Sequence, residues 1–259
     1  MIRTETLLSM SETSVLLVGE AWQSLQFDIK GFDFFSRSTY HESIEPLQDA
    51  LESNGIETEY IPTTRAAREF PTSVDEIAEF DVVVLSDIGY NTLALPPATF
   101  DDFEQVPNRL QLLEDFVQAG GGLIMIGGYL SFQGINGKAN YRDTPVEAAL
   151  PVTIQSYDDR VERSDGVEPV VANGSHTVVE GLPEEWPALL GYNRVVSDDD
   201  AEELVRVDED PLVVVGEHGE GRSGAFTSDC APHWGAPRFT DWEHYDGLWT
   251  DLVNWVAGE

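Results

Sequence analysis

The sequence contains a single cysteine, Cys230, among its 259 residues. One cysteine excludes an intramolecular disulfide, and it also excludes metal sites of the Cys-x-x-Cys type. A lone cysteine is usually a small core hydrophobe, so we expect Cys230 to be buried and unreactive. The five histidines never show the His-Glu-x-x-His spacing of a helical zinc site. We therefore predict that the protein uses no metal and no cofactor.

Long apolar runs are also lacking. No run approaches the ~18 apolar residues that a membrane-spanning helix needs. The segment 1–14 is polar, carries Glu5 and Glu12, and has no apolar signal-peptide core. These absences predict a cytoplasmic protein without a membrane partner.

Positive charge is the third scarcity. Lysine and arginine together number 14 against 48 aspartates and glutamates, which gives a formal net charge of -34. The acidic residues are spread along the chain and do not form one tail, as in the run Asp198-Asp199-Asp200. Such a surface is typical of a protein from a high-salt cytoplasm. The electrostatic screening length is only about 3 Å at 1 M salt, so repulsion among the acidic residues is suppressed. We predict a halophilic protein without a nucleic-acid partner, because phosphate contacts require basic surfaces.

Five apolar runs rich in β-branched residues predict strands. They do not alternate with polar residues, as expected of strands buried on both faces of a sheet. The runs are 15–18, 82–85, 123–126, 212–215 and 225–227. An apolar stripe at Ile44, Leu47 and Leu51, followed by a short strand at 57–61, completes a βαβ unit after the first run.

The remaining segments fit the same α/β pattern. Pro107 is expected to open a second helix, 142–150 a short helix, and 211–228 a hairpin. We expect 151–210 to add loops and β-structure at one sheet edge, and a last helix to end near Val256. Alternation of strands and helices implies a mostly parallel, doubly wound sheet in a single domain over residues 1–259.

Glycines surround one predicted strand and its end, over residues 120–134. This pattern is typical of a strand-to-turn elbow, which lifts one side chain above the carboxyl edge of a sheet. Glycines flank the lifted residue because neighbouring Cβ atoms would clash. Here the lifted residue is Tyr129, whose phenol has an ordinary pKa of about 10 and is a poor nucleophile but a good hydrogen-bond donor.

Polar and aromatic residues follow four of the predicted strands. In open parallel sheets ligands bind beyond the carboxyl ends of the strands, so we expect these residues to meet in one cleft. The catalytic candidates are Tyr129 as a donor and His233 with Asp229 as an imidazole and carboxylate pair. The ligand-binding candidates are Glu20, Trp22, Asp87, Asn91, Ser131 and Trp234.

Each candidate also has a structural interpretation. An aspartate after a strand often caps a turn by accepting hydrogen bonds from backbone amides, which applies to Asp87 and Asp229. His233 next to Trp234 can pack as an amphipathic residue, and Trp22 suits a core or rim position. Residues 191–194 are candidates for a side wall of the cleft.

Several phrases resemble the class I glutamine amidotransferase-like superfamily, and more closely its branch of amidotransferase-like proteins. The phrases are 86–92, 120–134, Tyr141 with Thr144-Pro145, 158–162, 191–193 and 227–235, which together extend over nearly the whole chain. The resemblance implies a flavodoxin-like α/β sandwich of three layers.

The same resemblance implies that the usual amidotransferase chemistry is missing. Active members carry a Gly-x-Cys-x-Gly elbow and a histidine with a carboxylate two residues later. Here Tyr129 stands at the place of the thiol and Gly235 at the place of the acid, although His233 falls in the histidine segment. A phenol attacks amides poorly, and Cys230 follows a different strand. We predict no ordinary glutaminase activity.

Three functions stay open at this point. The first is an amidotransferase-like protein that binds an unidentified small polar ligand in the cleft without hydrolysing it. The second is a hydrolase or isomerase of altered chemistry, which uses the catalytic candidates on a small polar or carbohydrate-like substrate. The third is a homo-oligomeric scaffold whose aromatic interface includes Trp242, Tyr245 and Trp249.

Overall fold

The computed structural model describes residues 13–259 of the chain. The prediction that 1–14 lacks a signal-peptide core lies almost entirely outside the described residues. Within 13–259, no helix combines the length and the apolar character needed to cross a bilayer.

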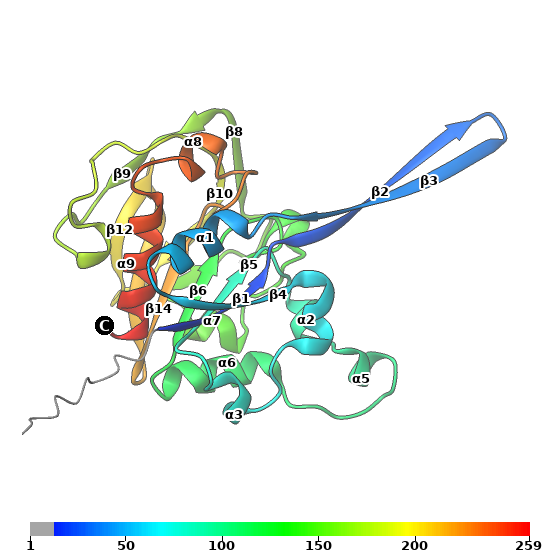
Figure 1. The fold of residues 1–259 in the computed structure, drawn as a ribbon, viewed down its shortest axis with the longest axis horizontal. Helices are drawn as coiled ribbons and strands as arrows, with labels where there is room; N and C mark the ends of the chain where they lie inside the picture. The colour runs from blue at the N-terminus through cyan, green and yellow to red at the C-terminus, as the bar shows by residue number, and fades with distance from the viewer. Residues whose placement is uncertain (1–12) are drawn as a thin grey trace, which may run out of the picture.

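A mainly parallel sheet of eight strands forms the centre of the molecule (Figure 1). In spatial order the strands are β4 (Glu57–Pro62), β1 (Ser14–Gly19), β5 (Val82–Ser86), β6 (Gly122–Ile126), β14 (Gly221–Phe226), β13 (Asp210–His218), β12 (Glu202–Val207) and β9 (Pro169–Val171). The pairs from β4 to β14 are parallel, whereas β13, β12 and β9 continue the sheet in antiparallel pairs. All five predicted strands are confirmed, and β13 with β14 forms the predicted hairpin.

Helices cover both faces of the sheet, which explains why its inner strands are apolar without alternation. On β1, Val15 and Leu17 belong to the core on one face, whereas Leu16 and Val18 belong to the core on the other. The first core is closed by α1 (Glu45–Ser53) and α9 (Tyr245–Ala257). The second is closed by α2 (Thr63–Glu69), α3 (Val74–Ile77), α4 (Tyr90–Ala94), α6 (Arg109–Gln118) and α7 (Pro145–Ala149). The result is a three-layer α/β sandwich, as the resemblance implied.

Helix boundaries follow local chemistry. The side-chain oxygen of Asn108 caps α6 by accepting hydrogen bonds from the amides of Leu110 and Gln111. Pro107 therefore precedes the cap, and the prediction that it opens the helix was wrong by two residues. Asn54 and Gly55 end α1 as predicted, because Gly55 adopts a φ of 83°.

Shorter elements lie around this sheet. They are β7 (Val152–Ile154), β8 (Arg160–Val167), β10 (Leu189–Asn193), β11 (Val195–Ser197), the 3-10 turns η1 (Ile135–Gly137) and η2 (Thr177–Val179), and the one-turn helices α5 (Pro97–Phe100) and α8 (Pro237–Thr240). Two antiparallel pairs form among them, β8 with β10 and β7 with β11.

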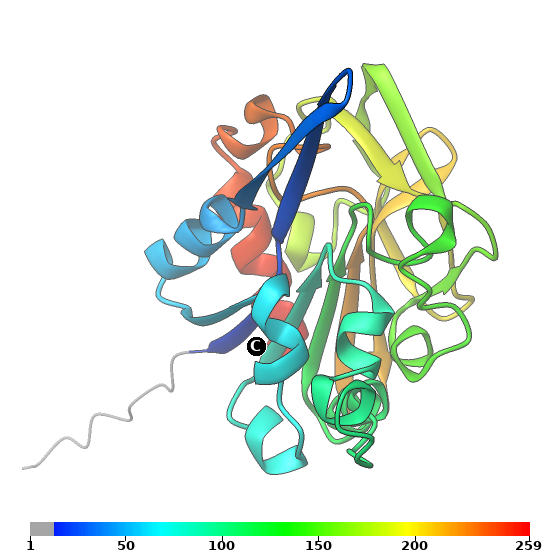
Figure 2. The same cartoon turned by 90° about the vertical axis from the view of Figure 1, so that its right-hand side faces the viewer.

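A long two-stranded ribbon leaves the body directly after β1. Its strands β2 (Ala21–Lys30) and β3 (Asp33–Glu42) pair along their full length around a turn at Gly31 and Phe32. Figures 1 and 2 show the ribbon extending away from the rest of the molecule. No predicted element covers these residues, so the ribbon is an addition to the predicted fold. We call it the arm.

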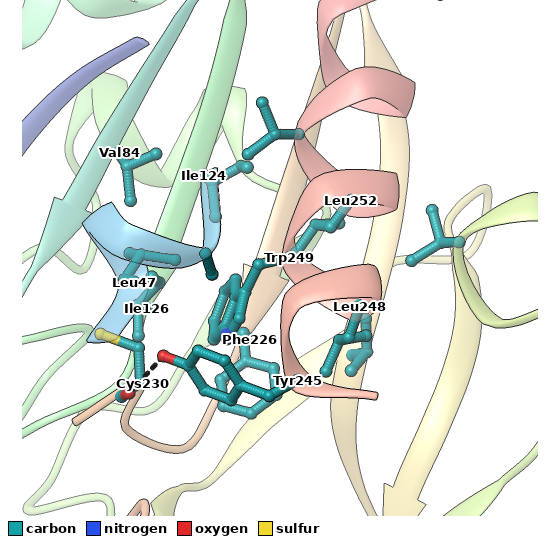
Figure 3. Close-up of a cluster of buried hydrophobic side chains, with 14 of the residues drawn as sticks. Leu47, Val84, Ile124, Ile126, Phe226, Cys230, Tyr245, Leu248, Trp249 and Leu252 are labelled. Carbon is teal, nitrogen blue, oxygen red and sulfur yellow. Dashed lines mark hydrogen bonds between the residues drawn. The ribbon is translucent and has the colours of Figure 1, made fainter. Parts of the chain in front are cut away.

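The aromatic residues predicted to form an interface lie elsewhere. Tyr245 and Trp249 are only 1% exposed; they pack against each other in the core beneath α9, and Trp249 also packs against Phe226 (Figure 3). The phenol of Tyr245 donates a hydrogen bond to the carbonyl of Cys230 at 2.7 Å. Trp242 is half-buried against the same core. The interface prediction was wrong for Tyr245 and Trp249, because the amphipathic stripe of α9 faces the sheet; for Trp242 it stays a prediction.

Candidate functional site

The elbow at the end of β6 has the backbone that its glycines predict. A Cβ on Gly127 would lie 2.1 Å from the carbonyl oxygen of Thr227, which no side chain can tolerate. Gly128 has a φ of 152°, and a Cβ there would lie 2.9 Å from Oδ1 of Asp87. Tyr129 follows these two glycines and is half-exposed beyond the sheet edge. The close approach of three strand ends therefore requires glycine at both positions.

The ends of β1, β5, β6 and β14 meet around a cleft of about 700 Å³. These strands are neighbours in the sheet, so the residues that follow them come together at one edge. The cleft is lined by Glu20, Trp22, Ser43, Asp87, Tyr129, Leu130, Ile135, Lys138, Asp229, Pro232 and His233. The three catalytic candidates and three of the six ligand-binding candidates are among them.

Asp87 is bound to the elbow from beneath. Its Oδ1 accepts a hydrogen bond of 2.6 Å from the backbone amide of Leu130, and Asp87 has a positive φ of 44°. Burial raises the pKa of Asp87 to about 6, and the charge of Asp229 adds to this although the Leu130 hydrogen bond opposes it. Asp87 therefore both caps the elbow and holds a proton that titrates near neutral pH.

His233 and Asp229 form the predicted pair. Nδ1 of His233 lies 3.3 Å from Oδ2 of Asp229, which is 3% exposed, while the imidazole remains accessible from the cleft. The other oxygen of Asp229 accepts a hydrogen bond from the amide of Ala231. Burial lowers the pKa of His233, but the hydrogen bond to Asp229 and the negative charges nearby outweigh it, and the net shift is upward.

Glu20 forms the buried floor beside this pair. Its carboxylate accepts hydrogen bonds from the hydroxyls of Ser86 at 2.5 Å and Ser43 at 2.9 Å. Burial raises the pKa of Glu20 well above its usual range, and the charges of Asp229 and Asp87 act in the same direction. Three carboxyl groups and an imidazole therefore share a small volume, in which protons and charge must be distributed among them.

Tyr129 uses its hydroxyl outside this cluster. The phenol donates a 2.8 Å hydrogen bond to Oε1 of Glu162, and the guanidinium of Arg160 lies 5.3 Å from the ring centroid. The ring edge packs on His233 with centroids 4.5 Å apart. Partial burial, followed by the bond to Glu162, raises the pKa of Tyr129. Glu162 was not predicted as a site residue, because it comes from β8, far from the strand ends.

The predicted side wall lies behind the elbow and supports it. Oδ1 of Asn193 accepts a hydrogen bond from the amide of Gly128, and its Nδ2 donates one to Asp159. Asp159 is 1% exposed and also accepts hydrogen bonds from the amides of Gln133 and Gly134. These contacts fix the loop after Tyr129 without reaching the cleft.

Three predicted ligand-binding residues do not line the cleft. Asn91 is exposed on α4 and borders a neighbouring groove, which Leu130 and Lys138 share with the cleft. Ser131 is 2% exposed, and its hydroxyl accepts a hydrogen bond from the amide of Asp87. Trp234 is 1% exposed and packs edge-on against Tyr129 with centroids 5.8 Å apart. Ser131 and Trp234 therefore support the site from outside the cleft, and Asn91 belongs to another groove.

One trio within residues 13–259 brings potential metal-ligand atoms within 4.8 Å of one another: Glu20, Asp229 and Cys230. Cys230 is fully buried, and burial raises the pKa of its thiol well above the usual range. A metal would require the thiolate, and both oxygens of Glu20 already accept hydrogen bonds from serine hydroxyls. The trio therefore suits a protonated, hydrogen-bonded cluster better than a metal centre.

The chemistry available in the cleft is acid–base chemistry. His233 faces the cleft with Asp229 behind it, and Asp87 has a pKa of about 6 beside them. An imidazole and a carboxyl group side by side can take up and release a proton on a bound molecule. Thiol chemistry is excluded at the elbow, since the sole cysteine is buried behind Asp229.

Comparison with known proteins agrees with this architecture. A family model described as "Putative glutamine amidotransferase" matches residues 14–258, and the chain belongs to this family. No curated protein matches the sequence.

Two solved structures from Salmonella typhimurium are similar over almost their full length. Cytoplasmic protein STM3548 is 41% identical with a TM-score of 0.91, and the match covers 93% of this chain and 98% of that one. Cytoplasmic protein STM1381, from strain LT2, is 40% identical with a TM-score of 0.91, and the match covers 94% of this chain and 99% of that one. A protein described as "Putative thua-like" from Parabacteroides merdae shares the fold at 13% identity, with a TM-score of 0.57 and coverage of 95% and 90%.

Proposed function

We propose that this protein is a glutamine amidotransferase-like binding protein, which holds a small polar ligand in the cleft and does not hydrolyse glutamine. One observation carries the proposal: the amide of Leu130 is bonded to the carboxylate of Asp87 at 2.6 Å. In elbow hydrolases, the amide that follows the nucleophile stabilises the oxyanion of the reaction. Here a carboxylate oxygen occupies that donor, and its charge would repel an oxyanion.

The other parts of the hydrolytic machinery support the same conclusion. The hydroxyl of Tyr129 donates its proton to Glu162, and partial burial raises its pKa, so a phenolate nucleophile is disfavoured. At the place of the catalytic acid, a Cβ on Gly235 would lie 2.5 Å from the carbonyl oxygen of Asp229. The backbone therefore leaves no room for an acidic side chain at that position.

The lining of the cleft indicates the chemistry of the ligand. Glu20, Asp87 and Asp229 supply carboxyl groups at the floor, whereas Trp22 and Ile135 supply apolar walls. Ionised carboxylates are hydrogen-bond acceptors, so a ligand that presents donors to Asp87 and Asp229, such as hydroxyls or an ammonium group, fits the floor. The ligand class we propose is therefore a small sugar, polyol or amine.

Two assays test this proposal in molar salt. The wild-type protein should release no ammonia from glutamine. Glutamine turnover that persists in the Tyr129→Phe variant and disappears in the Cys230→Ala variant would overturn the proposal that glutamine is not hydrolysed. Titration calorimetry with a panel of monosaccharides, polyols and small amines should give saturable binding to at least one class. That binding should be lost in Asp229→Asn and retained in Asn91→Ala, which changes the neighbouring groove. Equal binding to both variants would remove the cleft as the site.

A second candidate function is an acid–base enzyme, a hydrolase or isomerase acting on the same class of molecule. The observation that favours it is the 3.3 Å pair of His233 and Asp229 facing the cleft beside Asp87, whose pKa is about 6. Incubation of the same panel followed by proton NMR distinguishes the two functions. Conversion that His233→Gln abolishes would favour the enzyme, whereas binding without conversion favours the binding protein.

We also propose a cytoplasmic location, which the names of the two Salmonella proteins state for those proteins. A high-salt cytoplasm is proposed because the formal net charge of -34 is best tolerated where charges are strongly screened. The whole chain is taken to act as one domain.

A further inference from the structure

The arm has one apolar face and one polar face. Residues directly opposite on paired strands lie on the same face, and the register pairs Ile29 with Phe34, Phe27 with Ser36, Leu25 with Ser38 and Gln23 with Tyr40. We call this side the apolar arm face; its large side chains are Leu25, Phe27, Ile29, Phe34 and Tyr40. The opposite side carries Ser24, Gln26, Asp28, Phe35, Arg37 and Thr39. Such alternation is typical of a ribbon with one buried face.

The isolated chain leaves that face uncovered. Phe27 is 64% exposed, Ile29 76% and Phe34 72%, and Phe32 at the tip is fully exposed. The arm reaches away from the body, so no other segment of the described chain packs on its outer half (Figures 1 and 2). A lone two-stranded ribbon is at best marginally stable in water and needs further strands or packing. Something must therefore cover this face whenever the arm is folded.

The open area matches one half of a protein interface. Large side chains each bury about 200 Å² when covered. The exposed fractions of the apolar arm face and of Phe32 therefore leave roughly 800 Å² open, which is about what one partner contributes to a standard interface. Two such faces, one from each copy, would supply the whole area of a stable dimer.

Charge favours a second copy as the occupant. Residues 21–42 contain three acids, Asp28, Asp33 and Glu42, and two bases, Lys30 and Arg37, so the arm has a formal charge of only -1 in a chain of net charge -34. Between residues 23–29 and 34–40, the apolar face itself carries no charged side chain. The strongly acidic bodies of two copies repel each other, whereas their arms can approach with little electrostatic repulsion. The same net charge opposes docking on an anionic lipid surface.

We propose that two copies of this chain form a dimer by packing their arms together through the apolar arm face. The contact is self-complementary, since each copy offers the same patch, as a twofold interface requires. A second copy of the chain is always present, so it can cover the apolar arm face whenever the arm is folded.

Sedimentation velocity of the full chain in molar salt tests the proposal. The wild-type protein should sediment as a single species with twice the mass of one chain. Adjacent phenylalanines provide a matched pair of variants, because Phe34 lies on the apolar face and Phe35 on the polar face. Phe34→Ser combined with Phe27→Ser should weaken the dimer about 100-fold or more, as loss of central interface aromatics does. Phe35→Ser should leave it intact, and circular dichroism should show an unchanged body in every variant.

A cross-linking experiment gives an independent readout. Cys230 is buried, so a single cysteine placed on the arm is the accessible thiol among the described residues. Under mild oxidation, Ser36→Cys should form a disulfide between two copies, whereas Thr39→Cys on the polar face should not. A monomeric wild-type protein, a dimer that Phe34→Ser with Phe27→Ser leaves intact, or a monomer that floats with phosphatidylglycerol vesicles through its arm would each overturn the proposal.

Discussion

Nδ1 of His233 lies 3.3 Å from Oδ2 of Asp229, a carboxylate that is almost completely buried. The hydrogen bond and the charge of Asp229 stabilise the imidazolium, which is why the pKa of His233 is raised despite partial burial. Asp229→Asn should therefore lower the pKa of His233, as measured by the NMR titration of its ring protons. His176 lies against Trp255 on α9, away from the cleft, and its titration should be the same in both proteins. An unchanged or raised pKa of His233 would contradict the paired geometry.

The raised pKa of Asp87 predicts how the stability of the fold changes with pH. Because its pKa rises from 3.8 to about 6 on folding, the folded state binds the proton more tightly than the unfolded state. The ionised form is therefore disfavoured in the fold, and stability should fall as pH rises from about 4 through 6. Asp87→Asn removes this penalty while keeping an oxygen for the amide of Leu130. The variant should gain up to about 3 kcal/mol at pH 8 and little at pH 4, as measured by thermal unfolding at fixed salt. A loss of stability at pH 8 would show that the charge of Asp87 is needed.

Thiol reactivity tests the placement of the only cysteine. Cys230 is fully buried and burial raises its pKa, so an aromatic disulfide reagent should modify it no faster than the protein unfolds. Tyr129→Cys places a thiol on the half-exposed elbow, and this variant should react in the native state. It should still release no ammonia from glutamine, because Asp87 continues to occupy the amide of Leu130. Rapid modification of the wild-type protein would contradict the burial of Cys230.

Removal of salt should destabilise the fold. At a formal net charge of -34, self-repulsion grows as the screening length increases from about 3 Å at 1 M to 30 Å at 0.01 M salt. Far-ultraviolet circular dichroism should show loss of structure as potassium chloride is dialysed away, with recovery when it is restored. Undiminished stability in dilute buffer would remove the high-salt interpretation.

The core of the fold could be predicted from the sequence because its strands are buried on both faces. Val15 to Val18 and Val82 to Leu85 are continuous apolar runs, and such runs have few alternatives to a central strand. The arm was missed because its signal is different. Leu25, Phe27 and Ile29 alternate with polar residues and are mostly exposed, so they do not form a buried run.

The candidate site could be predicted only in part. The ends of neighbouring parallel strands had to meet, which brought Glu20, Asp87 and Asp229 together, but the direction of each side chain depends on local backbone angles. Asn91 is on the exposed side of α4. The hydroxyl of Ser131 points beneath the elbow, where it accepts a hydrogen bond from the backbone amide of Asp87. Glu162 reaches Tyr129 through the pairing of β8 with β10, for which no local sequence pattern exists.

The scarcity of lysine makes the arm and the cleft separately addressable. Lys30 lies near the tip of the arm and Lys138 at the mouth of the cleft; both are exposed, and they are the only two lysines in the chain. An amine-directed fluorophore therefore has two side-chain targets. Lys30→Arg directs the dye to the cleft, and Lys138→Arg directs it to the arm, so occupancy and assembly can be followed by separate optical signals.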